Sequence, residues 1–235
     1  VLASAAGHVE VVRLLLEAGA DKNLADDNGC TALMAASFKG HVEAVRLLLH
    51  VGARQDLADD SGMTALMLAA GGCHVEVLRS LLEAGADLSL VDAAFIVALG
   101  RRHFEAFRLL LNAGANKDLA DASGRTALML AAEQCQLELL RLLLEAGADK
   151  NLADNNGCTA LMMARTVEAM RLLLDAGAST DLVDNMGNTA LMVASSKGHV
   201  ERVRLLLDAG AKKDVANDTG STALSMAISQ MTLAA

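Results

Sequence analysis

Histidine and cysteine are the residues of this chain best suited to chemistry, because both can bind metals or act in catalysis. Five of the six histidines occur at equivalent places in a repeating pattern: His8, His41, His74, His103 and His199. Stacked helices lie about 8–10 Å apart, whereas every ligand of a zinc ion lies about 2 Å from it. One histidine per repeat therefore predicts a structural role, in which each ring organises the turn between two helices.

No catalytic or metal-binding motif accompanies these histidines. The cysteines Cys30, Cys73, Cys135 and Cys158 form no CxxC pair, which argues against a zinc site and favours reduced thiols. The sequence contains no Ser-His-Asp arrangement, phosphate-binding loop or nucleophile elbow. We therefore expect no enzyme activity, no cofactor and no metal.

Acidic and basic residues recur in a structural pattern. Glu and Arg lie three residues apart on predicted helices, which places each pair on one face and stabilises the helix by a few tenths of a kcal/mol. Aspartates at the start of each loop are expected to accept loop hydrogen bonds. The pairs are Glu10/Arg13, Glu43/Arg46, Glu76/Arg79, Glu105/Arg108, Glu138/Arg141, Glu168/Arg171 and Glu201/Arg204; the aspartates are Asp26, Asp59, Asp121, Asp154 and Asp184.

The composition favours helices and restricts the partners. Hydrophobic residues make up 53% of the 235 residues, but aromatics only 2%, and Pro, Trp and Tyr are absent. Abundant Ala and Leu favour helix. The net charge of −9 argues against nucleic acid or an anionic membrane surface as the main partner. The chain has no long apolar run and no signal-peptide pattern, so we expect no membrane insertion and a cytoplasmic, intracellular location.

A repeat of 33 residues organises the sequence. Gly-Ala follows each Leu-rich run at Gly19, Gly52, Gly85, Gly114, Gly147, Gly177 and Gly210, with spacings of 33, 33, 29, 33, 30 and 33. The predicted repeats are residues 1–25 (partial), 26–58, 59–91, 92–120 (shortened), 121–153, 154–183 (shortened), 184–216 and 217–235 (partial). We expect them to form a single domain.

Each full repeat predicts a helix, a turn, a second helix and a loop. In the repeat at 26–58, Thr31 is placed to cap the first helix, and Gly40-His41 interrupts it. The second helix carries an apolar stripe and ends at Gly52. One repeat cannot bury this stripe alone, so neighbouring repeats must stack.

The sequence resembles the ankyrin repeat family over nearly its whole length. The motifs that carry the resemblance are D-x-x-G-x-T-A-L, G-H-V-E-x-V-R-L-L-L and A-G-A-D at period 33. The resemblance implies an all-α ankyrin-repeat solenoid of stacked helix-turn-helix units with projecting β-hairpin-like loops. This chain has Thr-Ala-Leu-Met where the family usually has Thr-Pro-Leu-His. We interpret the column Met34, Met67, Ile96, Met129, Met162, Met192 and Ser225 as core.

The incomplete repeats predict local differences. The repeat at 92–120 should have a short or absent loop, and the repeat at 154–183 a shortened first helix or turn. These irregular deletions argue against a designed consensus protein. The first repeat begins inside a helix, and the last lacks a second helix, which suggests a piece of a longer array. We expect a monomer. The alternative is a weak end-to-end association through the incomplete terminal repeats, which Ile228→Glu would reduce.

The family resemblance also implies where a partner protein binds. In the family, ligands usually meet the loops and the exposed side of the first helices, which together form the concave face. We call this region of the chain the first-helix surface. Its predicted partner-binding residues are Asn28, Phe38, Lys39, Asp60, Met63, Arg101, Arg125, Glu133, Gln134, Asn156, Arg165, Met186, Asn188 and Lys197.

The sequence thus predicts a non-catalytic protein-interaction scaffold that binds another protein on its concave face. Binding hot spots favour Trp, Tyr and Arg, whereas this surface has one Phe and few Arg. Two alternatives therefore remain: a structural spacer or elastic segment of a larger protein, and an engineered repeat binder.

Overall fold

The computed structural model describes residues 1–233. These residues form fifteen α-helices, and their only β-structure is a set of isolated bridges. The chain divides into two compact units, an N-terminal unit, Val1–Asn116, and a C-terminal unit, Lys117–Ala235. The predicted all-α fold of helix-turn-helix repeats is confirmed, and the single domain stays a prediction.

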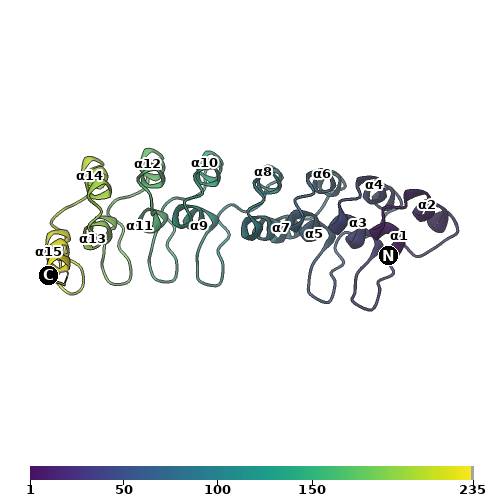
Figure 1. Cartoon of the computed structure of the whole chain (residues 1–235), viewed down its shortest axis with the longest axis horizontal. Helices are drawn as coiled ribbons and strands as arrows, with labels where there is room; N and C mark the ends of the chain where they lie inside the picture. Colours follow the sequence, from purple (N-terminus) through teal and green to yellow (C-terminus); the bar gives the residue numbers. More distant parts are fainter. Residues whose placement is uncertain (234–235) are drawn as a thin grey trace. The chain divides into compact units, whose positions relative to one another are not determined.

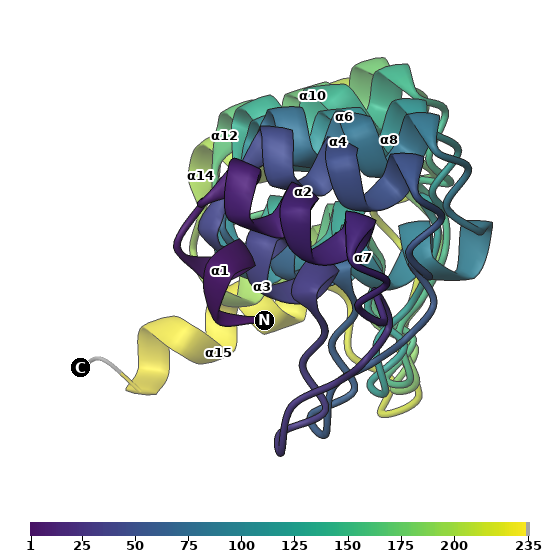
Figure 2. The same ribbon diagram turned by 90° about the vertical axis from the view of Figure 1, so that its right-hand side faces the viewer.

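Pairs of helices build both units. In the N-terminal unit, α2, α4 and α6 lie along one side, and the shorter α1 and α3 lie on the other (Figure 2). Its helices are α1 (Leu2–Ala5), α2 (Val9–Glu17), α3 (Ala32–Lys39), α4 (Val42–His50), α5 (Ala65–Gly71), α6 (Val75–Glu83), α7 (Leu88–Arg101) and α8 (Phe104–Asn112).

The C-terminal unit repeats this arrangement. Its second helices form one row, and its first helices lie between that row and the projecting loops (Figure 1). Its helices are α9 (Ala127–Glu133), α10 (Leu137–Glu145), α11 (Ala160–Met163), α12 (Val167–Asp175), α13 (Ala190–Ser196), α14 (Val200–Asp208) and α15 (Ala223–Leu233). Within residues 1–233, no helix has the length and apolar character needed to cross a membrane.

Threonine starts most first helices, as predicted. The Thr31 hydroxyl accepts a hydrogen bond from the amide of Met34, and Thr64, Thr126 and Thr189 cap α5, α9 and α13 in the same way. Such a cap satisfies an amide that has no partner inside the helix. Thr159 is the exception, because its hydroxyl makes no cap bond.

The loops before these helices are β-hairpin-like. Antiparallel bridges close five of them at Ala58–Thr64, Ala120–Thr126, Ala153–Thr159, Val183–Thr189 and Ala216–Thr222. The loop aspartates accept hydrogen bonds as expected: the Asp26 carboxylate, for example, accepts from the amides of Asn28 and Cys30, both at 3.0 Å. The aspartate loops are therefore fixed by their own carboxylates, and in the last loop the Asn217 side-chain oxygen accepts from the amides of Thr219 and Ser221 instead.

The shortened repeat at 92–120 has no projecting loop, which confirms the prediction. Helix α7 starts at Leu88 and runs for 14 residues, so it crosses the predicted repeat boundary at residue 92. Inside α7, Phe95 packs on Phe107 of α8 with ring centroids 4.3 Å apart. The absence of Gly and Pro between Leu88 and Leu99 lets the helix continue through the former loop.

The shortened repeat at 154–183 has lost part of its first helix, also as predicted. Helix α11 has four residues, and Ala164 leaves the helical conformation with φ −57° and ψ 119°. Thr166 then caps α12 through a hydrogen bond from the amide of Ala169. The deletion thus removes the last turn of the first helix and the glycine turn.

The core follows the apolar stripes, but the predicted methionine column is wrong at two positions. Met34, Met129, Met162 and Met192 are buried, while Met67 is half-buried. Ile96, however, is 39% exposed, and Ser225 is exposed as well. Ile96 lies in the extended helix α7, which buries Val91, Ala94, Phe95 and Ala98 instead.

The predicted Glu–Arg ladder is incomplete. Ion pairs join Glu and Arg on α2, α4, α6, α8 and α14, at 2.8 to 3.8 Å. Arg141 and Arg171 form no ion pair with any described residue, so the prediction is wrong for Glu138/Arg141 and Glu168/Arg171. Exposed side chains gain too little from pairing to fix one geometry.

Candidate functional site

The loop of the repeat at 121–153 holds Arg125 in place. The Asp121 Oδ1 atom accepts hydrogen bonds from the amides of Ser123, at 2.8 Å, and Arg125, at 2.9 Å. The Arg125 guanidinium also forms an ion pair with Asp121, with Nη2 3.3 Å from Oδ2. The hydrogen bond from the Arg125 amide is the largest of several causes that lower the pKa of Asp121. The carboxylate is therefore ionised at neutral pH and anchors the arginine.

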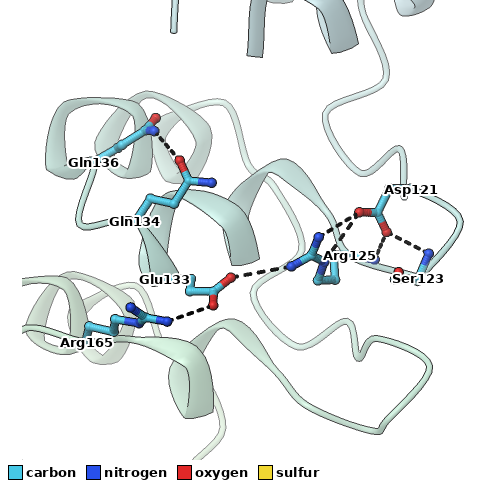
Figure 3. Close-up of polar contacts among 7 residues, drawn as sticks. All are labelled: Asp121, Ser123, Arg125, Glu133, Gln134, Gln136 and Arg165. Atoms are coloured by element: carbon cyan, nitrogen blue, oxygen red, sulfur yellow. Dashed lines mark hydrogen bonds and ion pairs between the residues drawn. The ribbon is translucent and has the colours of Figure 1, made fainter. Parts of the chain in front are cut away.

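Glu133, the last residue of α9, joins two successive repeats. Its Oε2 atom lies 3.5 Å from Arg125 Nη1 in the same repeat, and its Oε1 atom lies 3.0 Å from Arg165 Nη2 in the next. Figure 3 shows Arg125, Glu133 and Arg165 in one row. Exposed ion pairs stabilise proteins by at most about 1 kcal/mol, so this network orients charges more than it stabilises the fold.

A cavity of about 490 Å³ lies where α11 is cut short. We call it the notch. It opens beside Glu133 and Arg165, so the charge network forms part of its wall. The notch is lined by Glu133, Cys158, Met162, Met163, Ala164, Arg165, Val193, Lys197, His199 and Arg202.

Arg202 of α14 reaches the truncated end of α11. Its Nη1 atom donates a hydrogen bond of 2.8 Å to the carbonyl oxygen of Ala164. The last carbonyl groups of a helix have no partner inside the helix, so this guanidinium satisfies one of them. Burial lowers the pKa of Arg202, which shows that its charge is partly removed from water.

Histidines make the corresponding contact in the N-terminal unit. The Nε2 atoms of His41, His74 and His103 lie 2.9 to 3.0 Å from carbonyl oxygens at the ends of α1, α3 and α5. The sequence predicted that these histidines organise their own turns. Their Nε2 atoms instead connect three repeats to the preceding ones, because the acceptor carbonyls belong to the first helices of those preceding repeats.

The notch carries an excess of positive charge. Lys197 is exposed and forms no ion pair with any residue that the structure describes, and Arg165 and Arg202 add two more cations. Desolvation, followed by the nearby charges of Arg202 and Lys197, lowers the pKa of His199, which favours the neutral ring. Burial raises the pKa of the Cys158 thiol, which therefore stays protonated.

The predicted site residues of the N-terminal unit are exposed or half-buried but form no comparable cluster. Phe38 is 53% exposed, and the Lys39 ammonium lies 5.2 Å from the centre of its ring. Asn28 and Asp60 meet through the backbone, where the Asp60 amide donates to the Asn28 carbonyl at 3.1 Å. Met63 lies in the loop before α5, and Arg101 is the last residue of α7.

In the C-terminal unit, Asn156 and Met186 are exposed on successive loops. Gln134 is also exposed, and its side chain accepts a hydrogen bond of 2.8 Å from Gln136 (Figure 3). The structure therefore brings Glu133, Arg165 and Lys197 together in the lining of the notch, with Arg125 paired to Glu133. Gln134, Asn156 and Met186 lie outside it.

Asn188 is not available to a partner, so its place in the predicted surface needs correction. The residue as a whole is only 8% exposed. The Asn188 amide group donates to Asp184 at 3.1 Å, and its oxygen accepts from Asn217 at 2.7 Å. The stacking of the last repeat thus turns this residue into an internal link.

Sequence reasoning missed Arg202, although the sequence contains a signal. In the second-helix motif V-E-x-V, the residue after Glu is apolar in the six preceding repeats. It is Arg only in the repeat at 184–216, which follows the shortened repeat at 154–183. The apolar residues are Val11, Ala44, Val77, Ala106, Leu139 and Ala169.

The described residues contain no group of three or more His, Cys, Asp or Glu side chains that could hold a metal ion. The chemistry available at the notch is therefore that of charge and hydrogen bonding: two guanidinium groups, one ammonium group and one carboxylate on a partly apolar wall.

Comparisons with known proteins identify related sequences and folds. The family model described as "Ankyrin repeats (3 copies)" matches residues 1–92, 90–154, 140–217 and 165–233. The solved ankyrin repeat domain of human ASB11 is 28% identical, with a TM-score of 0.70 over 89% of this chain and 96% of that domain. The ankyrin repeat domain of Bcl-3, described as a unique member of the IkappaB protein family, is 27% identical, with a TM-score of 0.65 over 96% and 91%. A search of curated protein sequences found no significant match.

Proposed function

Because the chain belongs to the ankyrin repeat family, whose repeats generally mediate protein–protein interaction, we propose that it is a non-catalytic scaffold that binds a partner protein through its first-helix surface. No catalytic family is indicated by the comparisons.

The observation that carries this proposal is the row Arg125–Glu133–Arg165 beside the notch. The three side chains come from two repeats and are held by one another and by the Asp121 loop. A partner that meets such a surface orders few side chains on binding, so less of its interaction energy is lost to entropy.

Exposed apolar groups on the same surface would supply the hydrophobic part of an interface. Phe38 is 53% exposed and Met186 is 65% exposed. Aromatic side chains and methionine are enriched in protein interfaces relative to other surfaces. These residues lie on separate units, and each unit could therefore contribute its own contacts.

The test is capture of partners from a cell lysate with the wild-type chain and two variants. The surface variant carries Phe38→Ala, Met63→Ala, Arg101→Ala and Arg125→Ala. The control carries Val11→Ala, Arg141→Ala, Arg171→Ala and Val200→Ala, which remove the same charge and truncate two apolar side chains at exposed positions on second helices. Circular dichroism verifies that both variants fold.

We expect at least one partner that wild type and control retain and the surface variant loses. Retention by all three chains would place the contact elsewhere. If no chain retains a specific partner, the spacer function is favoured, because a spacer needs no ligand on this surface.

A further inference from the structure

The notch is cationic in a chain that is acidic overall. The whole sequence has 29 Asp and Glu against 20 Lys and Arg. The notch, in contrast, has three cations, Arg165, Lys197 and Arg202, and one carboxylate, Glu133. This local reversal of sign marks the notch as a place where an anionic group would be attracted.

The single carboxylate does not neutralise these cations. Both Glu133 oxygens are already engaged, one by Arg125 and one by Arg165. Lys197 forms no ion pair among the described residues, and Arg202 donates to a neutral carbonyl. Two cations on one cavity wall thus lack an anionic partner, and a carboxylate there would form charge-assisted hydrogen bonds.

The wall between the cations is apolar. Met163 and Val193 are half-buried, and Met162, which also lines the notch, is buried. Methylene groups of a side chain would pack on this surface while its charged end meets Lys197 and Arg202. A glutamate side chain combines these two features, because a short apolar stem carries its carboxylate.

We propose that the notch receives a glutamate or aspartate side chain from an acidic segment of a partner protein. This inference rests on the proposed function, since it names the chemistry of the partner at one part of the first-helix surface. The deletion in the repeat at 154–183 creates the cavity, and Arg202 supplies a charge that the other repeats lack.

Selection from a phage-displayed library of random 12-residue peptides tests the proposal. The notch variant, Arg165→Gln with Lys197→Gln, removes two cations and leaves Arg202 in its structural contact. The control, Arg141→Gln with Arg171→Gln, makes the same charge change on exposed second helices of the C-terminal unit. A third variant, Val193→Phe, fills the cavity without changing any charge.

We expect the wild-type and control pools to be enriched in Asp and Glu, and the pools from the notch variant and from Val193→Phe not to be. A selected peptide should bind the notch variant at least about tenfold more weakly than wild type, as for the loss of a charge-assisted hydrogen bond. Replacing its acidic residue by the amide should weaken binding to wild type similarly and leave binding to the notch variant unchanged.

Three results would overturn the inference: no enriched peptide, no acidic enrichment, or equal enrichment with the notch variant. Competition by inorganic phosphate as strong as that by the acidic peptide would assign the notch to a free anion instead. Lysate capture separates the two proposals, because a partner lost with the surface variant but kept by the notch variant would support the scaffold and refute the acidic contact.

Discussion

Replacing Arg202 by methionine tests whether this arginine compensates for the truncated helix. Methionine keeps an unbranched apolar stem of similar length, so packing along α14 is largely preserved. The change removes the hydrogen bond of 2.8 Å from Arg202 Nη1 to the Ala164 carbonyl. It therefore isolates the guanidinium group from the rest of the side chain.

The expected loss is about 1 kcal/mol of unfolding free energy. A hydrogen bond from a charged donor stabilises a protein by about 1.5–3 kcal/mol. Two effects reduce this value for Arg202. First, burial lowers the pKa of Arg202, so replacing the guanidinium by the neutral methionine side chain recovers some desolvation free energy. Second, water in the open notch can solvate the Ala164 carbonyl that loses its donor.

Arg204→Met is the matched control on the same helix. Arg204 pairs with Glu201 at 3.7 Å, and both side chains are about two-thirds exposed, so its loss should cost less than about 0.5 kcal/mol. Urea unfolding followed by helical circular dichroism measures both variants. The data need a fit that allows more than one transition, because repeat arrays can lose cooperativity. If Arg202→Met costs no more than Arg204→Met, the capping role of Arg202 is refuted.

Three further predictions use pairs of equivalent positions or a single titrating group. Thr189→Ala should cost about 1 kcal/mol of unfolding free energy because it removes a helix cap. Thr159→Ala should cost almost nothing, since the buried Thr159 hydroxyl has no hydrogen-bond partner. Equal losses of unfolding free energy in urea would contradict this. Gly29→Ala and Gly62→Ala both place a side chain at positive φ. Only the Cβ at position 29 would lie 2.8 Å from Asp60 Oδ1, so Gly29→Ala should lower the thermal unfolding midpoint more than Gly62→Ala does. Asp121 has a lowered pKa in the folded protein. Its contribution to stability is therefore complete above the pKa of the unfolded state, about 4, and is lost as the pH falls through the pKa of the folded state. The stability difference between wild type and Asp121→Asn should therefore shrink below about pH 4 in urea titrations, and a pH-independent difference would refute this linkage.

The fold could be predicted from the sequence because each repeat contains its own local signals. Thr31 and its equivalents start helices, loop aspartates bind the loop amides, and the period of 33 residues requires stacking. These signals act within a few residues, so they survive in every complete copy. The predicted capping and loop bonds were therefore confirmed at most positions.

Interactions between repeats were harder to predict. Asn188 seemed to be a surface residue, yet Asn217 of the next repeat covers its side chain. The histidines seemed to serve their own turns, but their rings contact the preceding repeat. In both cases the partner lies about one repeat away, and its position depends on how the helices stack.

The two shortened repeats show that the place of a deletion decides its structural effect. A deletion before the first helix is absorbed when α7 extends from Leu88 through the former loop. A deletion after the first helix leaves α11 with four residues and a terminal carbonyl to satisfy. The following repeat has Arg202 at a position that is apolar in all the others, where a buried charge beside a complete helix would be costly. The arginine thus satisfies the carbonyl that the deletion leaves at the end of α11, and both features line the notch at this repeat interface.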